Sequence, residues 1–255
     1  RDLFHRLLLR CERLSFRLAD ISIATNESYR QIALGRGGRN PDKVFVVRSG
    51  PDLNRMRPRP ANSAWKRERR FGVGYVGVMG HQEGLHHLLA AIEYLVHGQG
   101  RGDIQFLCIG DGPERSHLIR QARDRGIEDF VCFPGRLSDE DMVAALCAAD
   151  LCVNPDDANE MNDKSTMLKI MEYMAFGKPI VQFDLTEGRV SAQDAALYAA
   201  PNDPVDLAAK ITELLADPET CRRLGKRGRI RVETELAWEF EAPKLLAAYA
   251  ALWPE

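Results

Sequence analysis

Short apolar runs alternate with amphipathic segments along the chain from residue 71 onward. The runs lack a polar residue at every second position, which predicts strands buried on both faces. We expect such strands at residues 72–78, 104–109, 130–133, 151–154 and 180–183. The segments between them have helical spacing and predict helices at residues 85–96, 113–125, 139–148 and 166–176. Strands joined in succession by helices indicate an α/β fold, with a parallel sheet covered by helices on both faces.

The two ends of the chain follow other patterns. Residues 1–19 carry an apolar stripe among five arginines, which predicts an amphipathic helix. Short strands are expected at residues 20–25 and 44–47, with a helix between them at 27–34. We expect the first helix to pack against these strands, although a helix that lies on a membrane surface has a similar pattern. Three helices are expected near the other end, at residues 205–216, 218–232 and 238–252.

Composition is that of a globular protein, with 45% hydrophobic and 28% charged residues. No apolar run approaches the roughly 18 residues of a membrane-spanning helix, and the start lacks the pattern of a signal peptide. Because the first residue is Arg rather than Met, we expect a piece of a longer protein. The six cysteines have no Cys-x-x-Cys spacing, which predicts buried, reduced thiols and a cytoplasmic location.

Charge is distributed unevenly along the chain. Residues 1–70 hold 17 lysines and arginines against 7 acidic residues, whereas the remainder holds 18 against 30. A basic front end suits an anionic membrane surface or a phosphate-bearing acceptor, and the simpler interpretation is a solvated surface. We expect no nucleic-acid partner. Prolines and basic residues are frequent in residues 51–70, which predicts a linker.

One stretch, residues 162–197, combines clear boundary signals with charged residues. Ser165 or Thr166 is expected to cap the helix at 166–176, and Gly177 and Pro179 follow its end. A strand at 180–183 and a loop that runs through Glu187-Gly188-Arg189 to residue 197 complete the stretch.

Two charged residues of this helix, Lys169 and Glu172, lie three positions apart and therefore on one face. They are near the helix start, where free N–H groups and the helix dipole favour an anion. An anion site beside a carboxylate suggests a phosphorylated sugar as ligand. Two simpler interpretations stay open: an exposed surface lysine, or an ion pair between Lys169 and Glu172.

Ligands of open α/β sheets bind beyond the carboxyl ends of strands, where the strand order reverses. The glycine-rich or polar strand exits, all expected at one edge, are residues 77–84, 110–112, 134–136, 155–164 and 184–191. Glycines in 77–84 would let backbone amides approach a diphosphate, or they are only turn residues. The histidines show no metal-ligand spacing, and only His81, at a strand exit, is kept as a candidate.

Jointly, several segments carry a resemblance to a known family. They are Val73-Gly74-Tyr75-Val76-Gly77, Ile109-Gly110-Asp111-Gly112-Pro113, Phe133-Pro134-Gly135-Arg136-Leu137, Ala149-Asp150-Leu151 and Glu172-Tyr173-Met174-Ala175-Phe176-Gly177-Lys178-Pro179-Ile180-Val181. Their order and spacing resemble the donor-binding half of the family 4 retaining glycosyltransferases of the GT-B fold. The resemblance implies a Rossmann-like C-terminal domain for a nucleotide-diphosphate-sugar donor, an N-terminal domain for the acceptor, and no obligatory metal or other cofactor.

The resemblance assigns roles residue by residue. Glu172 matches the family's second conserved-motif glutamate, which holds the ribose hydroxyls of the donor. The first glutamate, eight residues earlier, is replaced by Lys164. Asp163 is therefore a candidate for the donor sugar, with the backbone N–H groups of Thr166 and Met167 near the phosphates.

The family's phosphate-binding arginine and lysine are replaced here by Val78 and Glu83, so Lys169 and Arg189 are the cations expected to take over. The loop at 133–137 resembles the region that contacts the nucleobase. No catalytic residue and no metal ligand is assigned. The full predicted donor-binding set is Gly80, His81, Glu83, Gly135, Arg136, Asp163, Lys164, Ser165, Thr166, Met167, Lys169, Glu172 and Arg189.

The resemblance also divides the chain into four parts. Residues 1–50 resemble a remnant of the acceptor-side domain, 51–70 the hinge, 71–236 the donor-binding domain, and 237–255 a helix that crosses back. The implied function is sugar transfer with retention to an unknown glycan, lipid or small-molecule acceptor, and this piece is expected to bind donor without turnover. The alternatives are a non-catalytic nucleotide-sugar-binding module, or a GT-B-type sugar epimerase, for which no acid or base is found at the strand exits.

Overall fold

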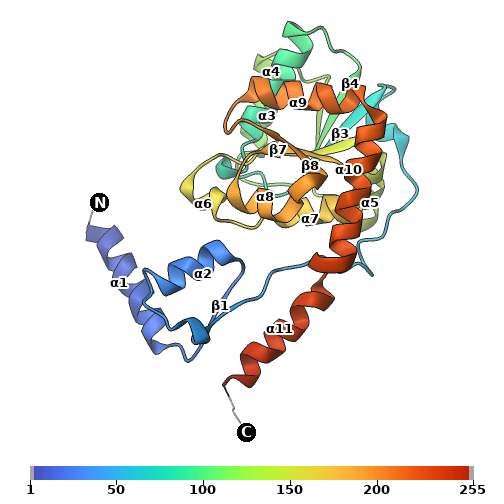
Figure 1. Cartoon of the computed structure of the whole chain (residues 1–255). Coiled ribbons are helices and arrows are strands. Elements are labelled where there is room, and N and C mark those ends of the chain that lie inside the picture. Colours follow the sequence, from blue (N-terminus) through green and yellow to red (C-terminus); the bar gives the residue numbers. More distant parts are fainter. Residues whose placement is uncertain (1–2, 253–255) are drawn as a thin grey trace.

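The computed structural model describes residues 3–252 and contains a six-stranded parallel sheet (Figure 1). The strands lie in the order β5-β4-β3-β6-β7-β8, so the chain runs outward from β3, returns to β6 and runs outward the other way. The predicted α/β fold with a Rossmann-like sheet is confirmed. The strands are β3 (Phe71–Val76), β4 (Ile104–Ile109), β5 (Val131–Gly135), β6 (Leu151–Asn154), β7 (Ile180–Phe183) and β8 (Ala196–Ala199).

Helices cover both faces of the sheet (Figure 1). One face carries α3 (Leu85–Glu93), α4 (Arg115–Asp124) and α9 (Pro204–Ala216), and the other carries α5 (Asp139–Ala148) and α7 (Leu168–Ala175). Shorter turns link these elements: 3₁₀ turns at Pro41–Lys43, Ser63–Lys66, His81–Glu83 and Gln193–Ala195, and π turns at Tyr94–Gly98 and Val232–Leu236.

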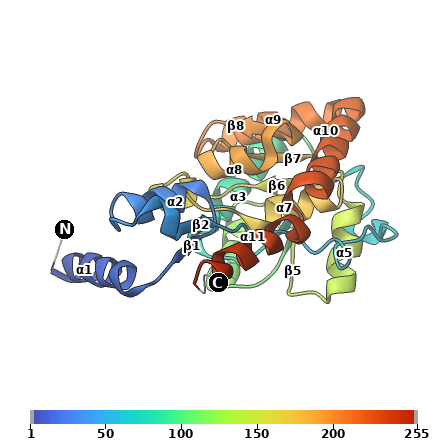
Figure 2. The same cartoon turned by 60° about the horizontal axis from the view of Figure 1, so that its bottom comes forward.

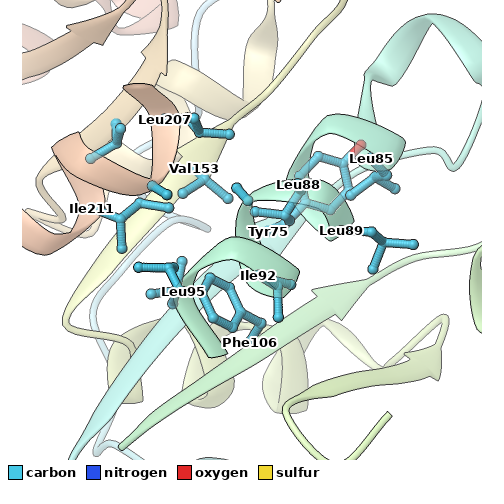
Figure 3. Close-up of a cluster of buried hydrophobic side chains, with 14 of the residues drawn as sticks. Tyr75, Leu85, Leu88, Leu89, Ile92, Leu95, Phe106, Val153, Leu207 and Ile211 are labelled. Atoms are coloured by element: carbon cyan, nitrogen blue, oxygen red, sulfur yellow. The ribbon is translucent and has the colours of Figure 1, made fainter. Parts of the chain in front are cut away.

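Two hydrophobic cores result, one on each face of the sheet. Along β4, Phe106 and Cys108 enter the first core, whereas Leu107 and Ile109 enter the second. Figure 3 shows the first core, in which Phe106 and side chains of β3 and β6 lie among leucines and isoleucines of α3 and α9. Because alternate side chains enter different cores, the strands need no polar positions, which explains their uniform apolar runs.

The loop predicted over residues 184–197 is wrong, because this segment contains helix α8 (Thr186–Ala192) and strand β8. The start of α8 is capped from outside: Thr186 N–H donates to Asp163 Oδ1 at 2.8 Å, and Thr186 Oγ1 to Asp163 Oδ2 at 3.0 Å. Asp163 is the last residue of a one-turn helix, α6 (Glu160–Asp163). Since this cap lies far from Thr186 in the sequence, no local signal marks the start of α8.

The N-terminal unit consists of α1 (Leu3–Leu18), β1 (Ser22–Ala24), α2 (Glu27–Leu34) and β2 (Val44–Val46). β1 and β2 form a separate two-stranded parallel sheet, and α2 packs on it. The expectation that α1 packs against these strands is wrong, because none of its residues is buried and most of its leucines are exposed. Helix α2 packs on both strands instead.

The last elements return toward the N-terminal unit (Figure 2). α10 (Pro218–Arg231) packs along α7 and α9, and α11 (Trp238–Ala250) contacts β2. Glu241 of α11 is buried and accepts a hydrogen bond from the Arg48 N–H at 2.9 Å. No helix within residues 3–252 is long and apolar enough to cross a bilayer.

Candidate functional site

Two loops meet at the centre of the sheet, where the strand order reverses. β3 and β6 are neighbours, and they lead into loops 77–84 and 155–159. Gly84 has a φ of +64°, and a Cβ atom there would lie 1.8 Å from the Pro155 carbonyl oxygen. The Asp157 N–H donates to the Gln82 carbonyl at 3.1 Å. The two loops are therefore in contact at the place where doubly wound sheets bind their ligands.

Lys169 of α7 reaches this junction and joins both loops. Its Nζ lies 2.5 Å from Glu83 Oε2 and 2.7 Å from Asp156 Oδ1, and the three side chains are only 9%, 16% and 0% exposed. The ammonium also lies 5.1 Å from the centre of the Tyr75 ring. The Tyr75 hydroxyl donates to the Val78 carbonyl at 3.0 Å. One buried cation is thus shared by two acids from two different loops.

With both carboxylates ionised, this cluster carries a net negative charge. Burial raises the pKa of Asp156 to about 6, and Lys169 opposes this shift. Asp156 Oδ2 is buried and has no hydrogen-bond partner among the described residues, which suits a carboxyl group that takes up a proton. Burial also raises the pKa of Tyr75, which therefore stays a neutral hydrogen-bond donor.

These contacts decide between the interpretations of Lys169. Lys169 is buried, so the interpretation as an exposed surface lysine is wrong. Among the residues that the structure describes, Lys169 pairs with Glu83 and Asp156 and makes no ion pair with Glu172. Sequence reasoning missed Asp156, because nothing local distinguishes it from its neighbour Asp157 in the strand exit.

Glu172 lies one helical turn further along α7 and faces a different space. Its half-buried side chain lines a cavity of 410 Å³ together with hinge residues 49–52, 55 and 56 and three residues of α5. Burial raises the pKa of Glu172, and the charge of Lys169 offsets part of this rise. A carboxylate that lines a cavity beside α7 is suitably placed to accept hydrogen bonds from a ligand.

The loop before α7 is held by the N-terminal unit. Asn26 Nδ2 donates to the Lys164 carbonyl at 2.8 Å and to Thr166 Oγ1 at 3.0 Å, and Ser165 Oγ lies 2.8 Å from the Tyr29 hydroxyl. The predicted capping of α7 by Ser165 or Thr166 is therefore wrong. α7 begins at Leu168, and Met167 at its N-cap provides no side-chain hydrogen bond.

Asp163 and Lys164, expected near the donor sugar, and Arg189, expected near the phosphates, are engaged elsewhere. Asp163 caps α8, and Lys164 Nζ lies 2.7 Å from Glu160 Oε1. Arg189 lies in α8 rather than in a loop, pairs with Asp184 at 2.5 Å and covers the ring of Tyr198 at 4.0 Å. The structure thus does not bring Arg189 to Lys169.

The remaining predicted residues flank the junction. Gly80 is buried and His81 exposed at the start of the 3₁₀ turn that leads into α3. Gly135, with a φ of +84°, ends β5, and its carbonyl accepts a hydrogen bond from the Gly110 N–H at 3.0 Å. Arg136 is exposed directly after it.

The histidines group in a way that their spacing does not predict. His86 and His87 in α3 point to Asp157 in the neighbouring loop, and one potential ligand atom from each residue lies within 4.8 Å of the others. The expectation that no histidine binds a metal stays a prediction. The group forms only in the folded chain, because Asp157 comes from a loop far from α3 in the sequence.

Comparisons with known proteins agree with this architecture. The family model described as "Glycosyl transferases group 1" matches residues 70–217. A 2-deoxystreptamine glucosyltransferase of Streptomyces kanamyceticus is 26% identical over 96% of this chain and 64% of its own length. A D-inositol 3-phosphate glycosyltransferase of Nocardia farcinica is 30% identical over 92% of this chain and 53% of its own length.

Solved structures share the fold. Sucrose-phosphate synthase from Thermosynechococcus elongatus has a TM-score of 0.81 at 24% identity, over 96% of this chain and 61% of that one. Anabaena HepE, solved in complex with UDP and glucose, also has a TM-score of 0.81, at 20% identity over 95% of this chain and 66% of that one. The chain thus spans between 53% and 66% of the length of these four relatives. Since the family match covers more than half of the chain and includes both loops of the junction, the chain belongs to the group 1 glycosyl transferases.

Proposed function

We propose that this chain binds the nucleotide-diphosphate-sugar donor of a retaining, family 4-type glycosyltransferase at the junction of β3 and β6. The observation that supports it is the buried Lys169, held between loops 77–84 and 155–159. A buried ammonium at the point of strand reversal suits the phosphates of a nucleotide, because doubly wound sheets bind ligands there.

Within this proposal the diphosphate takes the place of the Glu83 carboxylate on Lys169. Glu83 stands where the family resemblance expects a phosphate-binding lysine, and its side chain is partly exposed. Its release would free one side of the ammonium, while Asp156 keeps the other side. The start of α7, where Met167 at the N-cap makes no side-chain hydrogen bond, would offer backbone N–H groups to the same phosphates.

The donor's other parts follow from this placement. Glu172 would accept hydrogen bonds from the ribose hydroxyls of a donor that lies in the cavity beside it. The loop at 133–137 would lie near the nucleobase. During transfer, negative charge grows on the departing diphosphate, and Lys169 with the α7 N–H groups would stabilise it. We propose that these groups carry this charge without an obligatory metal.

The relatives support the donor class without identifying the sugar of this chain. Two of them are named as glycosyltransferases, and HepE was solved with UDP and glucose. We propose transfer to an acceptor held by the acceptor-side part of a longer enzyme.

Calorimetry of this chain with UDP-, GDP- and ADP-sugars tests the donor site. We expect one of the three nucleotide classes to bind at one site per chain, and the free nucleoside diphosphate to retain most of the affinity. Absence of heat from all three classes would contradict the proposal.

A nucleotide-sugar-binding module without transferase activity is the second candidate. It is favoured by Lys164, which occupies the position of the family's first glutamate and forms an ion pair with Glu160. Product analysis with the full-length protein and a donor panel separates the two, because a module binds donor and forms no product.

We also propose that α1 contacts an anionic membrane surface. Leu3, Leu7, Leu8, Leu14 and Leu18 are between 50% and 83% exposed on this helix, which also carries four arginines. A helix with a strong apolar face and basic flanks suits the interface of a bilayer that contains anionic lipids.

A further inference from the structure

Two histidines and an aspartate converge beside the junction but outside the proposed donor contacts of Lys169. Asp157 Oδ1 lies 3.3 Å from His87 Nε2 and 3.5 Å from His86 Nε2. The histidines belong to the first turn of α3, and Asp157 belongs to the loop that follows β6. Three potential ligand atoms, two from a helix and one from a loop, therefore lie close together.

The Asp157 carboxylate is held in place while one of its oxygens lacks a partner. The Asp157 N–H donates to the Gln82 carbonyl at 3.1 Å, and its carbonyl accepts from Asn162 Nδ2 at 2.9 Å. Oδ1, the atom that faces both imidazoles, is buried without a hydrogen-bond partner among residues 3–252. The two imidazole nitrogens lie beside this oxygen, so a cation between these atoms would be bound by all three.

The imidazole rings are also fixed by their surroundings. The His86 ring stacks on His81 with centroids 5.3 Å apart, and the His87 ring meets Phe183 edge-on at 5.4 Å. All three potential ligands are partly accessible, with side-chain exposures of 34% for His86, 18% for His87 and 19% for Asp157. A cavity of 330 Å³ lined by both histidines provides an entry path for an ion.

The separations match those of a small transition metal site. Zinc binds imidazole nitrogen and carboxylate oxygen at about 2.0–2.2 Å, so adjacent ligands in a tetrahedral site are about 3.3–3.6 Å apart. The two distances between nitrogen and oxygen at Asp157 fall in or next to this range. Imidazole ligands favour zinc and related ions over magnesium or calcium, which prefer sites made of oxygen.

We propose that His86, His87 and Asp157 bind one divalent transition-metal ion, with Zn²⁺ as the best match, and that the ion ties the first turn of α3 to loop 155–159. A fourth position stays open to water. The metal would join the start of α3 to the loop after β6, next to the close approach of Gly84 to Pro155. This inference does not depend on the proposed donor.

The test uses the chain without an affinity tag, stripped by a chelator and dialysed. Calorimetry with Zn²⁺ should show one ion per chain. Titration with Co²⁺ should give the visible absorption of a tetrahedral or five-coordinate site without a thiolate-to-cobalt band, because no cysteine belongs to the proposed set. Zero stoichiometry, or a strong thiolate band at the first equivalent, would overturn the proposal.

Variants locate the ion. Asp157→Asn and His86→Gln should each weaken Zn²⁺ binding by about 100-fold or more, since each removes a direct ligand and loss of an outer-shell partner alone costs about 10–100-fold. His117→Gln is the matched control, because His117 lines the same cavity but bonds to Gln121 at 2.9 Å. Zn²⁺ should raise the thermal midpoint of the native chain and of His117→Gln, and not that of Asp157→Asn. Unchanged Zn²⁺ affinity in both ligand variants would refute the site. Circular dichroism of the variants without metal checks that they fold.

Discussion

Lys169 forms ion pairs with two carboxylates at once, and ligand binding explains this arrangement better than stability does. A buried ion pair gains little net free energy, because desolvation of the charges offsets their attraction. A second carboxylate on the same ammonium adds repulsion between Glu83 and Asp156. Such a cluster is expected where an anionic ligand replaces one acid, and this exchange makes the roles of the two acids testable.

Glu83→Gln should increase the affinity for a nucleoside diphosphate by about tenfold, equivalent to about 1.4 kcal/mol. The reason is that the ligand no longer competes with a carboxylate for Lys169. Calorimetry measures the change, and Glu213→Gln, which removes an exposed partner of Lys210, serves as the control. Weaker binding by the Glu83 variant would show that the acid contacts the ligand directly.

Lys169→Ala should weaken nucleoside diphosphate binding far more than nucleoside binding, because only the former presents phosphates to the ammonium. The same change leaves Asp156 and Glu83 without their cation, so we expect a loss of about 3–5 kcal/mol in the free energy of unfolding. Urea unfolding checks the stability, and calorimetry with the two ligands checks the binding. Equal losses for nucleoside and diphosphate would count against the phosphate role.

The raised pKa of Asp156 predicts a pH dependence with a definite sign. The folded pKa, about 6, lies above the ordinary value of 3.8, so the folded state binds this proton more tightly than the unfolded state. The contribution of Asp156 to stability therefore falls as pH rises from about 4 through 6. Asp156→Asn, which mimics the neutral acid, should gain stability relative to the native chain across this window. Urea unfolding of both at pH 4.5 and pH 7.5 measures it, and a constant difference would contradict the shift.

At the scale of elements, α8 shows where sequence patterns stop being informative. The strands at 104–109, 151–154 and 180–183 and the helix at 139–148 follow from apolar periodicity, and their predicted bounds match the structure. α8 depends on Asp163, whose cap reaches across to another loop. The same limit applies to α7: Ser165 and Thr166 have cap-forming side chains, but Tyr29 and Asn26 engage them.

Asp163→Ala should therefore destabilise the chain by about 1 kcal/mol, the usual cost of a lost N-cap. Asp163→Asn keeps an oxygen acceptor for the Thr186 N–H and should lose less than half as much. Urea unfolding measures both, with Glu128→Ala as an exposed acidic control. Equal losses in the two Asp163 variants would mean that the charge, rather than the cap, holds α8.

At the scale of the whole molecule, the N-terminal unit shapes the site although it adds no strand to the main sheet. Asn26 holds the loop before α7, and Ser28 Oγ donates to the buried Glu187 of α8 at 2.6 Å. Arg48 pairs with the other Glu187 oxygen at 3.3 Å. Each contact joins residues more than 130 positions apart, so periodicity and local motifs cannot predict them. This explains why the sequence pattern placed Lys169 and Glu172 on one helix but did not predict which residues of the N-terminal unit contact the loop before α7 or Glu187.

The exposed face of α1 makes the membrane proposal testable with this chain. Cosedimentation with vesicles that contain phosphatidylserine should exceed that with phosphatidylcholine alone, and added salt should reduce it, because exposed charges are screened. Leu7→Asp and Leu14→Asp remove apolar contact at side chains that are each 54% exposed, so both should lower binding while the fold stays intact. Leu246→Asp is the matched control, since Leu246 is 68% exposed on α11. Equal sedimentation with both lipids would contradict the proposed contact of α1 with an anionic membrane. The acceptor-side part of a longer enzyme would then be the expected partner of the apolar face of α1.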